Sequence, residues 1–218
     1  MSLSGSPLDV SPVIPVVVIE DPARAVPLAR ALVAGGVGIV EVTLRTSRAL
    51  EAVAAIAAEV PEIALGVGSV LTPAQADTAI ERGAEFLVSP GAGPVLLRHL
   101  ADVPVPVLPG TATVSEMLTA REHGLHELKF FPAGPAGGPP YLAAVSAPVP
   151  GVRFCPTGGV TVATMSDYLA LPNVATVGGT WLTPPALVAA GDWPAVTRLA
   201  AEAVARARRA EGAPDRCR

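Results

Sequence analysis

Short runs of Val, Ile and Leu alternate along the chain with longer Ala-rich stretches whose apolar residues recur at helical spacing. The apolar runs show no polar alternation, which is typical of parallel strands buried on both faces. The pattern predicts strands at 13–19, 39–44, 63–67, 85–88, 105–108, 128–131, 152–155 and 174–177. It predicts helices at 22–34, 47–59, 73–82, 94–101, 114–123, 141–146, 162–169, 184–189 and 193–207.

Helix start and stop signals agree with these ranges. Asp21 precedes Pro22 as a candidate N-cap, and Thr72 stands in the same relation to Pro73. Gly35 and Gly36 follow the first helix, where a glycine commonly ends one.

Eight strand–helix units in 218 residues give about 27 residues per unit, near the lower size limit of a (β/α)8 TIM barrel. A doubly wound open sheet uses the same alternation and is the competing fold. Polar residues and glycines recur just after nearly every strand, and a barrel would gather all of them at its C-terminal mouth. They are Glu41 and Arg45, Gly68-Ser69, Ser89-Pro90-Gly91, Pro109-Gly110, Lys129, Thr157-Gly158-Gly159 and Gly178-Gly179-Thr180. We therefore predict one (β/α)8 TIM-barrel domain over 1–218, with about 12 N-terminal residues as an extension and 192–218 as a C-terminal helix and tail.

Composition narrows the possible partners. The net charge is −4, and the one basic run, around Arg206, Arg208 and Arg209, is expected to be a solvated helix end, so no nucleic acid is expected. No apolar run is long enough to span a bilayer. Cys155 and Cys217 form neither a disulfide framework nor a metal site, which favours a reducing cytoplasm. His99, His123 and His126 lack metal-ligand spacing, so we expect neither metal nor cofactor.

Lys129 is the only lysine in the chain and lies in the apolar run Leu128-Lys129-Phe130-Phe131. Burying an ammonium group is unfavourable unless it is paired, reaches solvent, or loses its charge. Desolvation lowers the pKa of an amine, and the uncharged amine is the form that attacks a carbonyl. The residue is therefore either a structural, paired or snorkelling lysine, or a nucleophile directed into the barrel.

Glu41 lies in a second apolar run, and strand alternation places Glu41, Thr43 and Arg45 on one face. Arg45 and Glu41 are expected either to form a structural ion pair or to divide the chemistry between them. In the second case Glu41 moves protons, and Arg45 binds a substrate carboxylate through its planar guanidinium.

Glycine turns end the last two predicted strands, at Thr157-Gly158-Gly159 and at Gly178-Gly179-Thr180. Glycines allow backbone N–H groups to approach an anion, and barrel enzymes often bind phosphate after strands seven and eight. Either turn alone is an ordinary glycine turn. Their occurrence in consecutive units favours a phosphate site.

Together these motifs resemble the 2-keto-3-deoxy-6-phosphogluconate (KDPG) aldolase family, which also includes 4-hydroxy-2-oxoglutarate (KHG) aldolase activity. The motifs are 41–45 (EVTLR), 66–71 (GVGSVL), 89–91 (SPG), 109–110 (PG), 129–133 (KFFPA) and 154–159 (FCPTGG), in the family's order. The resemblance implies a metal-free class I aldolase barrel, commonly a homotrimer, that cleaves KDPG to pyruvate and glyceraldehyde 3-phosphate.

The resemblance also implies a role for each site residue. Lys129 would form the Schiff base, and Glu41 would be the general acid and base, acting through a water. Arg45 and Ser69 would hold the pyruvoyl carboxylate. Thr157, Pro90 and Phe131 would line the pocket, and the phosphate would meet Gly158, Gly159, Gly179 and Thr180.

Three positions depart from the family pattern. Ser69 replaces a threonine and Thr180 a serine, and both changes keep the hydroxyl. Gly134 replaces a glutamate after the KFFPA motif, which removes a charge near Lys129. The alternatives that stay open are KHG cleavage, the phosphogalactonate epimer, a non-catalytic sugar-phosphate-binding barrel, and a sugar-phosphate epimerase or isomerase that needs no Schiff base.

Overall fold

The computed structural model describes residue 3 and residues 5–211. Cys217 and the end of the predicted C-terminal tail lie outside these residues. The strands are β1 (Val13–Val17), β2 (Ile39–Thr43), β3 (Ala64–Gly68), β4 (Phe86–Val88), β5 (Val107–Leu108), β6 (Gly110–Thr111), β7 (Glu127–Phe130), β8 (Arg153–Pro156) and β9 (Val177–Gly179).

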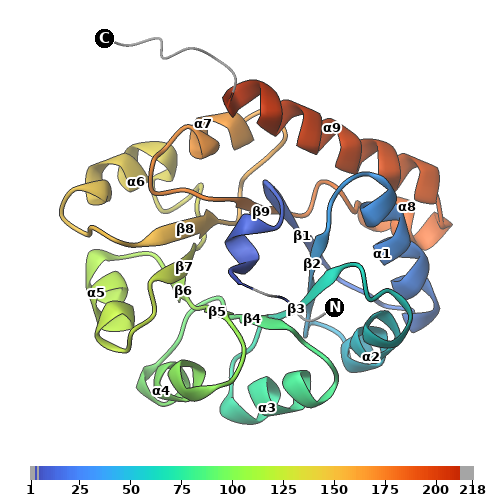
Figure 1. Cartoon of the computed structure of the whole chain (residues 1–218), viewed down its shortest axis with the longest axis horizontal. Helices are drawn as coiled ribbons and strands as arrows, with labels where there is room; N and C mark the ends of the chain where they lie inside the picture. The colour runs from blue at the N-terminus through green and yellow to red at the C-terminus, as the bar shows by residue number, and fades with distance from the viewer. Residues whose placement is uncertain (1–2, 4, 212–218) are drawn as a thin grey trace.

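All pairings between these strands are parallel, in a six-stranded sheet β5-β4-β3-β2-β1-β9 and a three-stranded sheet β6-β7-β8. Figure 1 shows both sheets curled around one centre, with the helices outside them. The fold is therefore a curled parallel α/β fold rather than a flat open sheet.

Backbone contacts join the two sheets on both sides. Pro109 separates β5 from β6, and its carbonyl accepts a hydrogen bond from the N–H of Lys129 at 3.0 Å. On the other side, an isolated parallel bridge pairs Thr157 with Gly178, and a second pairs Phe154 with Val174. The carboxyl ends of the strands consequently face the same end of the molecule.

The outer helices are η2 (Pro22–Arg24), α1 (Ala25–Ala34), α2 (Ala49–Glu59), α3 (Pro73–Glu81), α4 (Pro94–Asp102), α5 (Val114–Glu122), α6 (Gly138–Ser146), α7 (Met165–Leu169), α8 (Pro185–Ala190) and α9 (Trp193–Glu211). The predicted caps are confirmed: Asp21 accepts from the N–H of Ala23, and Thr72 forms a capping box with Gln75. Among the described residues, no helix is both long enough and apolar enough to cross a membrane.

Several helix predictions need correction: α6 begins three residues before the predicted 141, α9 extends four residues past the predicted 207, and two other helices begin differently from their predicted starts. The predicted helix 22–34 begins as the 3-10 turn η2, because Pro27 has no N–H to continue a single helical ladder and instead sits in the first turn of α1. The predicted helix 162–169 begins only at Met165, since Thr161 and Thr164 hydrogen-bond each other in a turn before it.

The predicted last strand, 174–177, is displaced toward the C-terminus. Val174 forms only an isolated bridge, and the strand proper is β9, whose two glycines pair with Ile14 and Pro15 of β1. Pairing with β1 outweighs the low strand propensity of glycine. The short strand β6 was not predicted, because Pro109-Gly110 has the composition of a loop.

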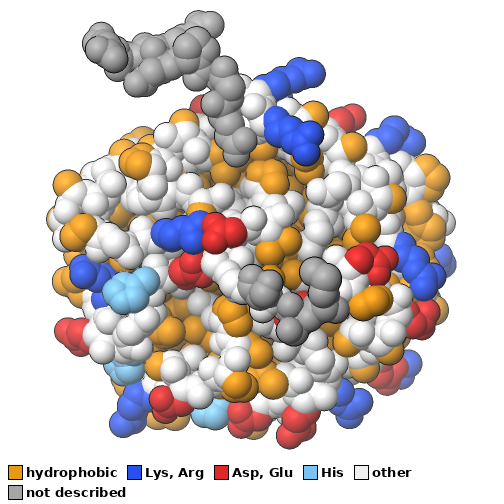
Figure 2. Space-filling view, viewed as in Figure 1, with side chains coloured by type: hydrophobic (Ala, Val, Ile, Leu, Met, Phe, Trp, Pro, Cys, Tyr) orange, Lys and Arg blue, Asp and Glu red, His pale blue; other side chains and the backbone are white. Residues whose placement is uncertain are grey.

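The N-terminal extension covers one end of the ring. Its 3-10 helix η1 (Pro7–Asp9) lies over the centre in Figure 1, and Leu8 is buried in the core. Arg153 pairs with both Asp9 and Glu127, and its hydrogen bond to Asp9 lowers the pKa of that carboxyl below its usual value. Figure 2, viewed from the same side, shows most of the charged side chains around the rim of this face and only a few near its middle.

Strand alternation separates an outer face from an inner one. Phe130 of β7 stacks on Tyr141 of α6 at a centroid distance of 5.4 Å and meets Phe154 of β8 edge to face at 6.4 Å. Lys129 and Cys155, which precede and follow these rings and pair in register, therefore face the opposite side, inside the ring.

Candidate active site

The central feature of the site is a buried contact between Lys129 of β7 and Glu41 of β2. The two residues are far apart in sequence, yet Lys129 Nζ donates to Glu41 Oε1 at 3.4 Å. Each side chain is only 4% exposed. Taking two charges out of water costs several kcal/mol per ion, and a single contact of this length recovers only part of that cost. Stability alone therefore gives a poor reason for the pair.

Glu41 fits inside the ring because its carboxylate lies over Gly68 of β3, the residue that pairs in register with Thr43. A Cβ on Gly68 would lie about 1.9 Å from Glu41 Oε1, and Gly68 has no positive φ that would demand glycine for the backbone. The glycine is needed for space. The carboxylate consequently crosses over β3 toward Lys129.

Arg45 and Ser69 lie together where β2 and β3 end. Arg45 Nε donates to Ser69 Oγ at 3.3 Å, and the Arg45 side chain is exposed. Ser69 is the only described non-glycine residue with positive φ, at 60°, a conformation that costs an L-residue energy and is often found at functional sites. The open alternative of a structural Glu41–Arg45 ion pair is wrong, because Glu41 pairs with Lys129 instead.

Phe131 lies beside the lysine, and Thr157 lies on the neighbouring strand end. Lys129 Nζ is 5.3 Å from the centroid of the Phe131 ring, within cation–π range. Thr157 follows β8 and is buried, and a Cβ on Gly178 would lie 2.1 Å from its Oγ1. The side chain of Thr157 therefore covers Gly178.

The second predicted glycine turn is wrong, because Gly178 and Gly179 belong to strand β9; the turn at Gly158 and Gly159 lies next to them, since Thr157 pairs with Gly178. Gly158 and Gly159 have φ of 90° and 83°, which side chains other than glycine rarely adopt. The Gly134 N–H donates to the carbonyl of Gly158 at 2.8 Å, so the loop containing this family departure packs against the turn. Thr180, next to Gly179, is exposed.

Pro90 lies on the other side of β6 from Lys129. A Cβ on Gly110 would lie 2.2 Å from the Pro90 carbonyl oxygen, and Gly110 pairs in register with Lys129. Ser89, which the sequence placed in the SPG motif without a site role, is buried and accepts a hydrogen bond from the Gly110 N–H at 3.3 Å. Its position at the end of an apolar strand, before Pro-Gly, is the signal that could have identified it.

Cys155 is a second residue that the sequence did not single out for the site. Its Sγ lies 3.8 Å from Thr157 Oγ1, and it pairs in register with Lys129. Burial raises the pKa of the thiol to about 12, so it is a neutral group beside the lysine at physiological pH. Cys155 stands two residues before Thr157, so strand alternation places both side chains on the same face, and this was the signal that could have identified it.

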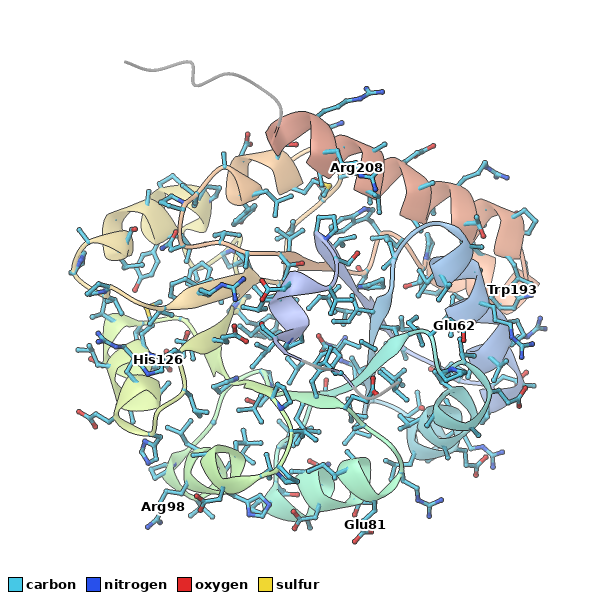
Figure 3. The ribbon with its side chains drawn as sticks, viewed as in Figure 1. Glu62, Glu81, Arg98, His126, Trp193 and Arg208 are labelled. Atoms are coloured by element: carbon cyan, nitrogen blue, oxygen red, sulfur yellow. The ribbon has the colours of Figure 1, made fainter. Side chains whose placement is uncertain are left out.

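The histidines lie away from this cluster. His126 precedes β7 at the opposite end of the strands, where Figure 3 labels it, and His99 pairs with Asp77 on the outer helices at 2.7 Å. Within residues 3 and 5–211, no group of three or more His, Cys, Asp or Glu side chains is placed to hold a metal ion.

Comparison with known proteins gives a consistent result. The family model described as KDPG and KHG aldolase matches residues 6–199. The chain is 49% identical over 197 residues to the KHG/KDPG aldolase of Escherichia coli K12, covering 90% of this chain and 92% of that protein. It is 47% identical over 194 residues to the 2-dehydro-3-deoxy-phosphogluconate aldolase of Pseudomonas aeruginosa, covering 89% and 88%.

The fold agrees as well. A solved KDPG aldolase from Legionella pneumophila superposes with a TM-score of 0.89 at 42% identity, covering 90% of this chain and 96% of that one. That crystal structure contains pyruvate captured at low pH as a covalent carbinolamine intermediate.

The role of Gly68 leads to a prediction. Gly68→Ala should destabilise the protein by about 1–3 kcal/mol, because the new methyl group and the Glu41 carboxylate cannot occupy the same space. Urea unfolding measures the change. Gly91→Ala is the matched control, since Gly91 is exposed with nothing within 4 Å of a Cβ, and it should stay within about 0.5 kcal/mol.

Shortening Glu41 should remove the clash. In a Glu41→Ala background, Gly68→Ala should therefore be much less destabilising than it is alone. Equal effects of Gly68→Ala in both backgrounds would contradict the packing described for Glu41.

Proposed function

The chain belongs to the KDPG and KHG aldolase family, and on that premise we propose that it is a Schiff-base aldolase that cleaves KDPG to pyruvate and glyceraldehyde 3-phosphate. The proposal includes cleavage of KHG to pyruvate and glyoxylate. The observation that carries it is the buried contact between Lys129 and Glu41, the pairing of an amine and a proton carrier that this chemistry requires.

In the proposed mechanism, the Lys129 amine attacks the C2 carbonyl of the substrate, and loss of water leaves an iminium ion. The C3–C4 bond then breaks, and its electron pair moves into the iminium to give an enamine. Glu41, through a water, takes the proton of the C4 hydroxyl as the aldehyde forms and returns a proton to C3. Hydrolysis of the resulting iminium releases pyruvate and regenerates the amine, so the cycle needs no cofactor.

Arg45 and Ser69 are proposed to bind the substrate carboxylate. The exposed guanidinium can offer two parallel N–H groups to a carboxylate, and the Ser69 hydroxyl beside it adds a third polar group. Pro90, Phe131 and Thr157 would then enclose the reacting carbons around Lys129. Pro90 lies against Gly110, which pairs with Lys129, the Phe131 ring lies beside Lys129 Nζ, and Thr157 pairs with Gly178.

The phosphate is assigned to Gly158, Gly159, Gly179 and Thr180. The positive-φ turn at Gly158 and Gly159 lies beside the end of β9 and the exposed Thr180 hydroxyl, and this arrangement suits an oxyanion because backbone N–H groups can approach it closely. This assignment favours KDPG over KHG. It does not distinguish the two configurations at C4, so the phosphogalactonate epimer is the alternative substrate. A non-catalytic sugar-phosphate-binding barrel is less favoured, because it would not require the buried Lys129–Glu41 pair.

We further infer that the two sheets form one closed (β/α)8 barrel with a C-terminal mouth. The Pro109–Lys129 hydrogen bond and the Thr157–Gly178 bridge support closure on both sides, with β5 and β6 as one strand interrupted by a proline. A phosphorylated metabolite as substrate fits a cytoplasmic enzyme.

A homotrimer is proposed as the assembly. Four apolar residues are exposed on neighbouring outer elements: Leu71 just before α3, Val95 in the first turn of α4, and Val114 and Leu118 in the first half of α5. A cleft of about 210 Å³ lies between α4 and α5. A second copy of this chain is the occupant we propose for that surface. A 28% identical structure with a TM-score of 0.83 belongs to a cage designed by fusing symmetric oligomeric domains.

The substrate proposal predicts an order of specificity. kcat/KM should be highest for KDPG and lower for unphosphorylated KHG by roughly tenfold or more, because the phosphate contacts add transition-state binding. Steady-state assays of pyruvate release from KDPG, its galactonate epimer and KHG measure this. Equal values for KDPG and KHG would make the glycine-turn assignment wrong, and binding without turnover would favour the non-catalytic barrel.

The assembly proposal predicts that Leu118→Glu lowers the mass in solution from three chains to one, because a carboxylate would be buried in the interface. Sedimentation equilibrium measures the mass. Val162→Glu is the matched control, since Val162 is equally apolar and 38% exposed but lies outside this surface. A trimeric Leu118→Glu variant would contradict the surface, and a monomeric unmodified chain would contradict the assembly.

A further inference from the structure

Two threonine hydroxyls hold together the ends of β1 and β2 where the backbone ladder between them stops. Val17 and Val42 are the last residues that pair in this ladder. Beyond them, Thr43 Oγ1 donates to the Val17 carbonyl at 2.8 Å, and Thr46 Oγ1 donates to the Ile19 carbonyl at 2.7 Å. Side chains thus replace the missing backbone pairs.

These two hydrogen bonds lie on either side of Arg45. On the other edge of the same segment, the Leu44 N–H donates to the Gly68 carbonyl at 2.8 Å. The Arg45 side chain itself is exposed and has one described hydrogen bond, to Ser69. The direction of the guanidinium therefore depends on how firmly its backbone is held, and Thr46 supplies the hydrogen bond on its C-terminal side.

We propose that Thr46 is a positioning residue for substrate binding: its hydroxyl fixes the backbone of Arg45 so that the guanidinium meets the carboxylate of a 2-keto acid. This rests on the role proposed for Arg45. Thr43 is fully buried and contributes to the core as well, whereas Thr46 is only partly buried, so Thr46 can be changed with less effect on folding.

The carboxylate of a 2-keto acid is bound in both the ground state and the transition state. Loosening its partner should therefore raise KM and leave kcat nearly unchanged. Thr46→Val, which keeps the shape and removes the hydroxyl, should raise KM for pyruvate in the condensation direction by roughly three- to tenfold, as expected for loss of one hydrogen bond. Thr46→Ser, which keeps the hydroxyl, should stay within about twofold of the unmodified enzyme.

Thr197→Val is the matched control. The Thr197 hydroxyl also donates from a partly buried side chain to a backbone carbonyl, that of Ala31 at 3.0 Å, but it joins α9 to α1 away from the site. It should lower the free energy of unfolding as Thr46→Val does and leave KM unchanged. Thr46→Ala gives the same comparison if the valine variant does not fold.

A double-mutant cycle separates positioning from general loosening. In an Arg45→Leu background, Thr46→Val should have no further effect on KM, because the group that it positions is gone. A full KM effect in that background, or equal KM values for Thr46→Val and Thr197→Val, would overturn the proposal. Failure of the unmodified enzyme to form a borohydride-trapped pyruvate adduct would instead refute the proposed aldolase mechanism.

Discussion

The burial of one ammonium group and one carboxylate in the same apolar interior is the constraint on which the site depends. Lys129 and Glu41 are each 4% exposed and touch at 3.4 Å. Removing either partner alone leaves an uncompensated buried charge, at a cost of about 3–5 kcal/mol, whereas replacing both with apolar residues is often neutral. The pair adds little to stability and carries a desolvation cost, so we attribute it to the chemistry proposed for Lys129 and Glu41.

Small residues around the pair make that burial possible. Gly68 leaves space for the Glu41 carboxylate, and Gly178 leaves space for the Thr157 side chain. Pro109 interrupts β5 and β6 and presents its carbonyl to the Lys129 N–H, while Cys155 stays a neutral thiol beside the amine. The strand ends thus combine close packing around the lysine with exposed groups, Arg45 and Thr180, for the anionic ends of a substrate.

Much of this could be predicted from the sequence, because buried parallel strands and their caps leave local signals. The order of strands and helices, the Asp21 and Thr72 caps, and an unusual lysine in an apolar strand were all visible without a structure. The errors occurred where tertiary contacts outweigh local preference. Gly178 and Gly179 form a strand because they pair with β1. Gly110 forms part of a strand because it pairs with β7. The sequence alone could not identify the ion-pair partner of Glu41. Strand alternation places Arg45 on the same face as Glu41, whereas the pairing with Lys129 depends on how distant strands are arranged in the fold.

The central claim is that Lys129 is the nucleophile, and trapping tests it most directly. Incubation of the folded protein with pyruvate and borohydride should reduce the iminium to a stable secondary amine, and peptide mass mapping should place the adduct on Lys129 alone. Because this is the chain's only lysine, the N-terminal amine is the sole competing primary amine, and it maps to a different peptide. Absence of the adduct from active, folded protein, or an adduct only at the N-terminus, would contradict the account.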